Sequence, residues 1–191
     1  MKQIQKYILL EEVFVHCNFA LVNFAEFKEL IRNKYSSKYK GIWLSLQIAL
    51  TNTSIVSSYI FSTKDSAKDR TNYLQKALLV NPNSALKNTI ARNYFMHIDE
   101  KFDYCLNNKD FFSGVLEIVV PNRQRFELVD KPSYFIRRAV IKNEMVFIFQ
   151  LGKKRYEIEL NPIISELETI LINSSIHIQK TKPIKGLYSF S

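Results

Sequence analysis

Arg92, Asn93 and His97 are the residues of this chain whose types and spacing suit a chemical reaction. Histidine exchanges protons near neutral pH, and arginine is a permanently charged fork that fits a phosphate. Together they are the minimum set of groups for breaking a phosphodiester bond without a metal. The alternative interpretation is a charged, solvated helix face that carries one histidine, because a short motif alone is only a hypothesis.

A helix predicted over residues 84–108, with Ser84 as its N-cap, would separate this motif from an apolar face. At about 100° per residue, one arc is apolar and predicts a core stripe: Ile90, Ala91, Tyr94, Phe95, Ile98, Phe102, Cys105 and Leu106. The other arc holds Thr89, Arg92, Asn93, Met96, His97, Glu100, Asp103 and Tyr104. Because Asn93 and His97 are four residues apart, their side chains can touch. The motif should therefore face away from the chain's own core, where a second copy would double the groups and exclude water.

The run from Ala91 to Asp103 resembles the R-N-x-x-x-H signature of the HEPN superfamily. This family comprises small helical proteins, many of which are metal-independent endoribonucleases that act as dimers. The resemblance covers roughly residues 1–110. Two positions depart from the wording of a related bacterial group. Lys101 stands where arginine is common and keeps the charge, whereas Met96 stands where glutamate is common and removes a carboxylate beside the histidine.

The resemblance implies an endoribonuclease whose composite site is built from both copies of Arg92, Asn93 and His97, with no metal and no cofactor. It also implies a homodimer, RNA as the partner, and a toxin or phage-defence role, with an antitoxin or a nucleotidyltransferase as a further partner. Some HEPN domains have lost catalysis, so the alternative is a non-catalytic module that binds RNA or a partner protein. Glu100 and Tyr104 share the motif's face and either support substrate binding or are ordinary surface or interface residues.

The composition predicts a well-filled core in a reducing compartment. The 191 residues are 47% hydrophobic and 13% aromatic, enough for one sizeable domain or a domain with an appendage. Cys17 and Cys105 lie far apart without metal-ligand spacing, which favours buried free thiols. Residues 41–63 are uncharged over a length that could cross a bilayer, but ten of these 23 residues are Ser, Thr, Asn or Gln. We expect a helix buried in protein there, and a cytoplasmic protein with no membrane span.

The net charge of +9 is concentrated in residues 123–155, which hold nine basic and three acidic residues. Charge of that density favours either phosphate attraction or a solvated surface that aids solubility. The RNA-binding residues predicted from it are Arg123, Arg125, Arg137, Arg138, Lys153, Lys154 and Arg155. The nearby aromatic residues suit either a stacking platform for single-stranded RNA or a sheet core with solvated arginines: Tyr134, Phe135, Phe147 and Phe149.

The hydrophobic periodicity predicts an α+β fold. Apolar spacing indicates helices over 3–34, about 41–62, 70–80 and 84–108, which suggests an up-and-down bundle that is HEPN-like. The spacing changes to strands at 134–141, 145–151 and 155–160, an antiparallel meander with either 115–120 or 126–129 as an added strand. Asn161 and Pro162 should open a closing helix. We therefore expect a bundle at 1–112, a small antiparallel sheet plus helix packed on it at 113–175, and a basic tail at 176–191.

His16 and His177 are weighed against the motif histidine as further chemical groups. His16 lies among apolar residues of the first predicted helix, which favours a core or boundary histidine over a second catalytic group. His177 lies near the predicted tail, where exposure to solvent is the default. The spacing of cysteines, histidines and carboxylates predicts no zinc or magnesium site.

Overall fold

The computed structural model describes residues 1–32, 39–88, 90, 94, 103, 107 and 114–182. Within them the chain is a mixture of helices and strands, which confirms the α+β class. The elements, in chain order, are α1 (Gln3–Arg32), α2 (Tyr39–Ile60), the 3-10 turn η1 (Asp65–Ala67), α3 (Lys68–Ala77), the 3-10 turn η2 (Ala85–Lys87), β1 (Gly114–Val120), α6 (Arg123–Val129), β2 (Tyr134–Ile141), β3 (Val146–Leu151), β4 (Lys154–Glu159) and α7 (Leu160–Thr181).

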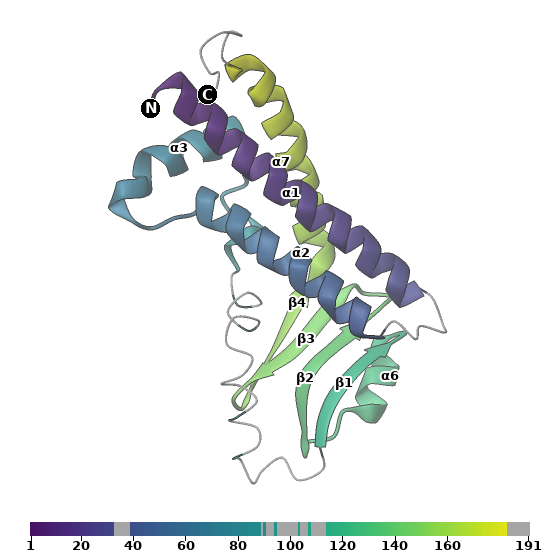
Figure 1. Cartoon of the computed structure of the whole chain (residues 1–191). Helices are drawn as coiled ribbons and strands as arrows, with labels where there is room; N and C mark the ends of the chain where they lie inside the picture. The colour runs from purple at the N-terminus through teal and green to yellow at the C-terminus, as the bar shows by residue number, and fades with distance from the viewer. Residues whose placement is uncertain are drawn as a thin grey trace.

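Helix α1 is the centre of the helical layer. Its main neighbours are α2 and the C-terminal helix α7, and Figure 1 shows it running alongside both. Its buried residues recur at intervals of three and four, so they form one stripe along the helix: Leu10, Val13, Cys17, Ala20, Phe24, Phe27, Leu30 and Ile31. The predicted N-terminal and C-terminal helices are thus confirmed, and α7 belongs to the same layer as α1.

Helix α2 shows how a helix rich in hydroxyl groups can be buried in protein. Ser45, Thr53, Ser54 and Ser57 are all buried. The Thr53 hydroxyl donates to the Ala49 carbonyl at 2.8 Å, so at that position the helix satisfies the polar group with its own backbone. This arrangement fits the expectation that residues 41–63 are covered by protein.

The outer face of α1 is apolar although it faces solvent. Ile8, Val15, Phe19 and Val22 are between 43% and 57% exposed. Among the described helices, α1 is the one that is long and apolar enough to cross a membrane. Of its most apolar 18-residue stretch, 28% is buried in the protein. Length and composition of this kind also occur in core helices of other proteins, so the cytoplasmic location remains a prediction.

The four strands form one mixed sheet in the order β1-β2-β3-β4. Strands β2, β3 and β4 make the antiparallel meander that the sequence predicted. Strand β1 confirms the added strand at 115–120 but pairs with β2 in parallel, so the expectation of an entirely antiparallel sheet is wrong. Parallel neighbours need a crossover between them, and α6 provides it. Residues 126–129, the other candidate for the added strand, lie in α6, which the Asn122 side chain caps by accepting from the Arg125 amide at 2.9 Å.

Apolar layers cover both faces of the sheet. One face shares a continuous core with α1, α2, α3 and α7 through Val140, Phe147, Phe149 and Ile158. The other face packs on Phe126 of α6 through Val120, Ile136, Ala139, Ile141, Val146 and Ile148. Strand β3 is therefore buried along nearly its whole length, whereas β4 keeps the alternation of a strand with one wet face.

Three predicted boundaries are wrong in detail. Ser84 does accept from the Leu86 amide at 3.1 Å, but it caps only a 3-10 turn. Asn88 then adopts an extended backbone and accepts from the Ile90 amide at 3.1 Å, so no single helix spans 84–108. Helix α7 begins at Leu160 after Glu159, which places Asn161 inside the first turn instead of at the cap. It continues to Thr181, so the first six residues of the predicted tail are helical, and 183–191 lie outside the described part of the chain.

We predict that Phe149→Ala lowers the free energy of unfolding by about 3–5 kcal/mol, the usual cost of removing a buried phenyl ring. Phe149 is 0% exposed, and its ring lies 5.2 Å from that of Phe147 and 5.6 Å from that of Tyr156. Urea unfolding followed by circular dichroism measures the change. The control Leu128→Ala, at a side chain that is 66% exposed, should change stability by less than about 0.5 kcal/mol. Equal losses in the two variants would contradict the assigned core.

Candidate functional site

The motif residues themselves lie outside the part of the chain that the structure describes. This holds for the predicted catalytic residues Arg92, Asn93 and His97 and for the supporting residues Glu100 and Tyr104. The structure does describe Tyr94, which lies between Asn93 and His97 in the sequence. The surroundings of Tyr94 therefore carry the structural information about this motif.

Tyr94 is buried against the sheet. It is 1% exposed, and its ring centroid lies 4.6 Å from that of Phe149 and 6.3 Å from that of Phe147. Its hydroxyl donates a hydrogen bond to the backbone carbonyl of Arg137 on β2. Burial raises the pKa of Tyr94 to about 12, an effect that the charges of Arg138 and Arg137 oppose. The residue inside the motif is thus a neutral core group that fixes this segment to the sheet.

Other described residues of the same segment agree with the predicted division into two faces. Ile90, Tyr94, Asp103 and Asn107 are all helical. Ile90 packs against the same core cluster that contains Tyr94, whereas Asp103 is exposed. The sequence places Ile90 and Tyr94 on the apolar arc and Asp103 on the polar arc. The structure confirms these assignments, because Tyr94 is buried, Ile90 is half-buried and Asp103 is exposed.

Arg123 and Arg155, both predicted to bind RNA, face carboxylates. Arg123 contacts Glu144 at 2.7 Å and Glu157 at 2.8 Å. The hydrogen bond to Glu144, reinforced by Glu157, raises the pKa of the Arg123 guanidinium. Arg155 donates to Asp130 at 2.9 Å. Because these pairs are partly exposed, each stabilises the fold only slightly, but each partly neutralises a charge expected to attract phosphate.

Arg137 and Arg138 share one carboxylate on the neighbouring strand. Glu117 of β1 lies 3.3 Å from Arg137 and 2.8 Å from Arg138. The Arg138 guanidinium also lies 4.8 Å from the ring centroid of Trp43 on α2, a cation–π distance. Arg138 is largely buried by these contacts, so it links the sheet to the helical layer rather than standing in solvent.

The remaining residues of the predicted RNA-binding set lie at the surface. Arg125 of α6 and Lys153 in the β3–β4 turn are exposed, and so is Lys154, whose Nζ lies 5.0 Å from the Tyr156 ring centroid. Phe135, Phe147 and Phe149 are buried, which confirms sheet core over an open stacking platform. Of the nine basic residues in 123–155, four thus form ion pairs in the fold: Arg123, Arg137, Arg138 and Arg155.

The two histidines outside the motif have ordinary positions. His16 Nδ1 lies 2.8 Å from the Asn52 Oδ1, and Nε2 lies 3.8 Å from Glu12, which confirms a boundary histidine. His177 is half-buried on α7. Cys17 is a buried free thiol as predicted, and burial raises its pKa to about 12. Within the described ranges, no group of three or more His, Cys, Asp or Glu side chains is arranged to hold a metal ion.

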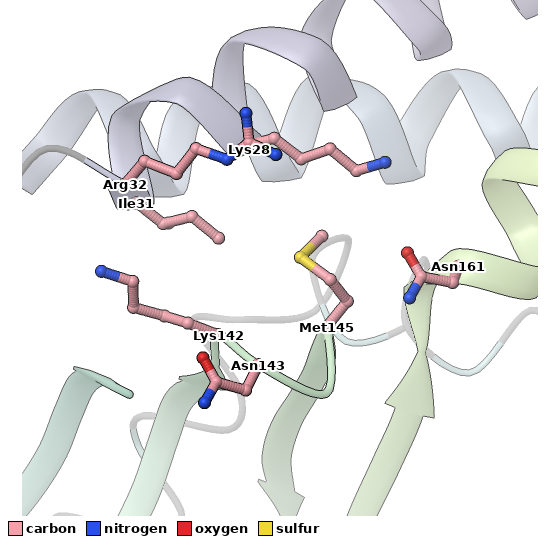
Figure 2. A pocket seen from close by; sticks show the side chains of 7 residues that line it. All are labelled: Lys28, Ile31, Arg32, Lys142, Asn143, Met145 and Asn161. Carbon is pink, nitrogen blue, oxygen red and sulfur yellow. The ribbon is translucent and has the colours of Figure 1, made fainter. Parts of the chain in front are cut away.

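A basic pocket that the sequence did not single out lies between the end of α1, the β2–β3 turn and the start of α7. It has a volume of about 300 Å³ and is lined by Lys28, Ile31, Arg32, Lys142, Asn143, Met145 and Asn161. Figure 2 shows Lys28 and Arg32 coming from the helix on one side, with Lys142 and Asn143 on the turn opposite. Two cations four residues apart near a predicted helix end were a usable signal. The sequence did not indicate that these two cations lie near Lys142, because that proximity depends on the tertiary fold.

We predict that Tyr94→Phe makes the protein less stable at pH 7 but less sensitive to alkali. Losing the hydroxyl should lower the free energy of unfolding by about 1 kcal/mol. Below pH 10 Tyr94 is neutral in both states. Between pH 10.0 and about 12 it ionises only when unfolded, so this group removes about 1.4 kcal/mol of stability per pH unit in the wild type.

Urea unfolding between pH 7 and 11 tests this, with Tyr134→Phe as the control at a half-buried tyrosine. Cys17 also contributes an alkaline loss, between pH 9.0 and about 12, so the slope should decrease rather than vanish. An unchanged slope above pH 10 in Tyr94→Phe would contradict the buried, neutral state of Tyr94.

No model of a known protein family, no curated protein and no solved structure matches this chain. The features of the chain that bear on a reaction are the motif at 92–97, the buried Tyr94 within it and the basic residues described above.

Proposed function

We propose that this protein is a metal-independent endoribonuclease of HEPN type that acts as a homodimer. The sequence motif Arg92-Asn93-x-x-x-His97 supplies the chemical groups. The observation that carries the proposal is the burial of Tyr94, because this residue commits one face of the segment to the core. A segment held by its apolar face is suited to present its polar face to a substrate or a second copy.

The proposed reaction uses groups of this chain alone. His97 accepts the proton of a ribose 2′-hydroxyl, and the oxygen attacks the adjacent phosphorus. The bond to the 5′-oxygen breaks, leaving a 2′,3′-cyclic phosphate and, once that oxygen takes up a proton, a free 5′-hydroxyl. Arg92 stabilises the charge that develops on the phosphate oxygens, and Asn93 orients the histidine or the phosphate.

A dimer needs a surface for the second copy, and the outer face of α1 is suited to it. Ile8, Val15, Phe19 and Val22 follow one another at intervals of seven, four and three residues and are all exposed. Such spacing is that of a heptad seam, which pairs with another helix of the same pattern. Contiguous exposed apolar residues of this kind are typical of interaction surfaces. We propose that two α1 helices meet along this stripe.

The biological setting that we propose follows from the resemblance alone. A HEPN-type ribonuclease of this kind would serve as a toxin or a phage-defence effector. Its activity would then be controlled by an antitoxin or a nucleotidyltransferase partner. An RNA cleavage assay in EDTA distinguishes the enzyme from the alternative, a non-catalytic module that binds RNA or a protein.

We predict that purified protein cleaves single-stranded RNA in the presence of EDTA, and that His97→Ala reduces the rate about 100- to 10,000-fold. Arg92→Ala should reduce it as well, since the transition state would lose its charged partner. Gel analysis of a labelled oligoribonucleotide measures the rate. His177→Ala is the matched control, because it removes a histidine outside the motif and should leave cleavage unchanged.

Circular dichroism should show that both motif variants remain folded. Cleavage that persists in His97→Ala and Arg92→Ala would overturn the catalytic assignment. RNA binding without cleavage by the wild type would favour the binding module.

We predict that Phe19→Glu weakens dimerisation by about tenfold or more, since it places a charge in the middle of the apolar stripe. Size-exclusion chromatography with light scattering, over a range of protein concentrations, measures the dissociation constant. Leu128→Glu introduces the same charge at an exposed leucine of α6 and should leave the dimer unchanged. A monomeric wild type, or equal behaviour of the two variants, would rule out α1 as the dimer interface.

A further inference from the structure

The pocket beside the C-terminal end of α1 differs from the paired arginines around the sheet in the state of its charges. Lys28, Arg32 and Lys142 all line it, and among the residues that the structure describes no aspartate or glutamate does so. Within the described ranges, none of the three forms a salt bridge, whereas Arg123, Arg137, Arg138 and Arg155 each face a carboxylate. The pocket is therefore a place where three cations without a carboxylate partner among the described residues line one cavity.

The uncharged lining adds donors and a wall. Asn143 and Asn161 carry side-chain amides that can each donate two hydrogen bonds. Asn161 lies in the first turn of the 22-residue helix α7, where the helix dipole adds a partial positive charge. Ile31 and Met145 supply apolar surface between the cations, as Figure 2 shows. A guanidinium, two ammonium groups and two amides around a cavity of about 300 Å³ match a small, strongly anionic group.

We propose that this pocket binds a backbone phosphate of single-stranded RNA. Arginine and lysine bind phosphate through charge-assisted hydrogen bonds, and such interactions give affinity without reading the base sequence. The assignment of the phosphate to RNA rests on the proposed function, whereas the affinity of the pocket for phosphate does not. The pocket would hold the strand, and the residues at 92–97 would cut it.

The test measures binding of a fluorescent 2′-O-methyl oligoribonucleotide, which keeps the phosphates but lacks the attacking hydroxyl. One variant carries Lys28→Gln, Arg32→Gln and Lys142→Gln. The matched control carries Lys68→Gln, Lys76→Gln and Lys180→Gln, which remove the same charge from exposed positions of α3 and α7. Single Arg32→Gln is made as well, because one exposed substitution at a helix end keeps the fold. Thermal unfolding verifies that all variants are folded.

The pocket variant should bind about tenfold or more weakly at about 0.15 M salt, and the control should lose clearly less affinity. The slope of log affinity against log salt should also become shallower by about 0.7 for each phosphate that the variant no longer neutralises. Arg32→Gln should shift both quantities in the same direction by a smaller amount. Equal affinities and slopes for the pocket variant and the control would overturn the proposal.

Two further arms separate the sources of the phosphate. Inorganic phosphate should compete with the oligonucleotide only weakly. It can take the place of one backbone phosphate in the pocket, whereas the strand carries many phosphates. Adenosine monophosphate that binds as tightly as the oligonucleotide would overturn the assignment to RNA in favour of a free nucleotide. Cleavage of unmodified RNA by the wild type is measured separately. Metal-free cleavage, together with equal RNA binding by the pocket variant and its control, refutes this inference alone. Pocket-dependent binding without cleavage refutes the nuclease alone.

Discussion

One buried tyrosine connects the segment that carries the motif to the body of the protein. The Tyr94 ring packs on Phe149 and Phe147, and its hydroxyl donates to the Arg137 carbonyl. Phe149 in turn stacks on Tyr156 of β4, so the aromatic cluster extends across neighbouring strands. Tyr94 stands between Asn93 and His97 in the sequence, so a residue that completes the core lies within the motif. A neutral, buried phenol at this position stabilises the segment without taking part in the proposed reaction.

Two groups of basic residues in the protein have different surroundings. Around the sheet, arginines are held by carboxylates of neighbouring strands and turns, with Glu117 between Arg137 and Arg138 as the clearest case. These interactions orient side chains and connect β2 to β1 and to Trp43 of α2. At the end of α1, by contrast, Lys28, Arg32 and Lys142 line a pocket to which the described part of the chain contributes no acidic residue. The net charge of the chain therefore does not by itself locate the pocket that we propose for phosphate; the pairing of the charges distinguishes it.

Much of the fold could be predicted from periodicity, and the failures have physical causes. The apolar stripes of α1 and α7 and the strands of the meander follow from local spacing alone. The parallel pairing of β1 with β2 does not, because a strand's own residues do not specify its neighbour or its direction. The apolar run at 126–129 was too short to separate strand from helix, and Asn122 as a cap was the signal for the helix. The predicted helix is interrupted at Asn88, whose backbone is extended and whose side chain accepts a hydrogen bond from the Ile90 amide.

The candidate site likewise has features that local spacing predicts and features that it does not predict. Ile90 and Tyr94 could be assigned to the apolar face and Asp103 to the polar face from the sequence, since helical geometry sets their spacing. The carboxylate partners of Arg123, Arg138 and Arg155 lie 21 to 34 residues away in the chain and meet them only through the sheet. The pocket likewise joins α1 to a turn more than a hundred residues later. No local pattern contains such pairings.

The end groups of RNA cut by the purified protein in excess EDTA test the central claim most directly. Attack by a 2′-hydroxyl must leave a 2′,3′-cyclic phosphate on one fragment and a 5′-hydroxyl on the next, and mass spectrometry of the fragments distinguishes these from other ends. The proposed mechanism predicts only those two ends. Fragments with a 3′-hydroxyl and a 5′-phosphate, or RNA that stays intact, would contradict it.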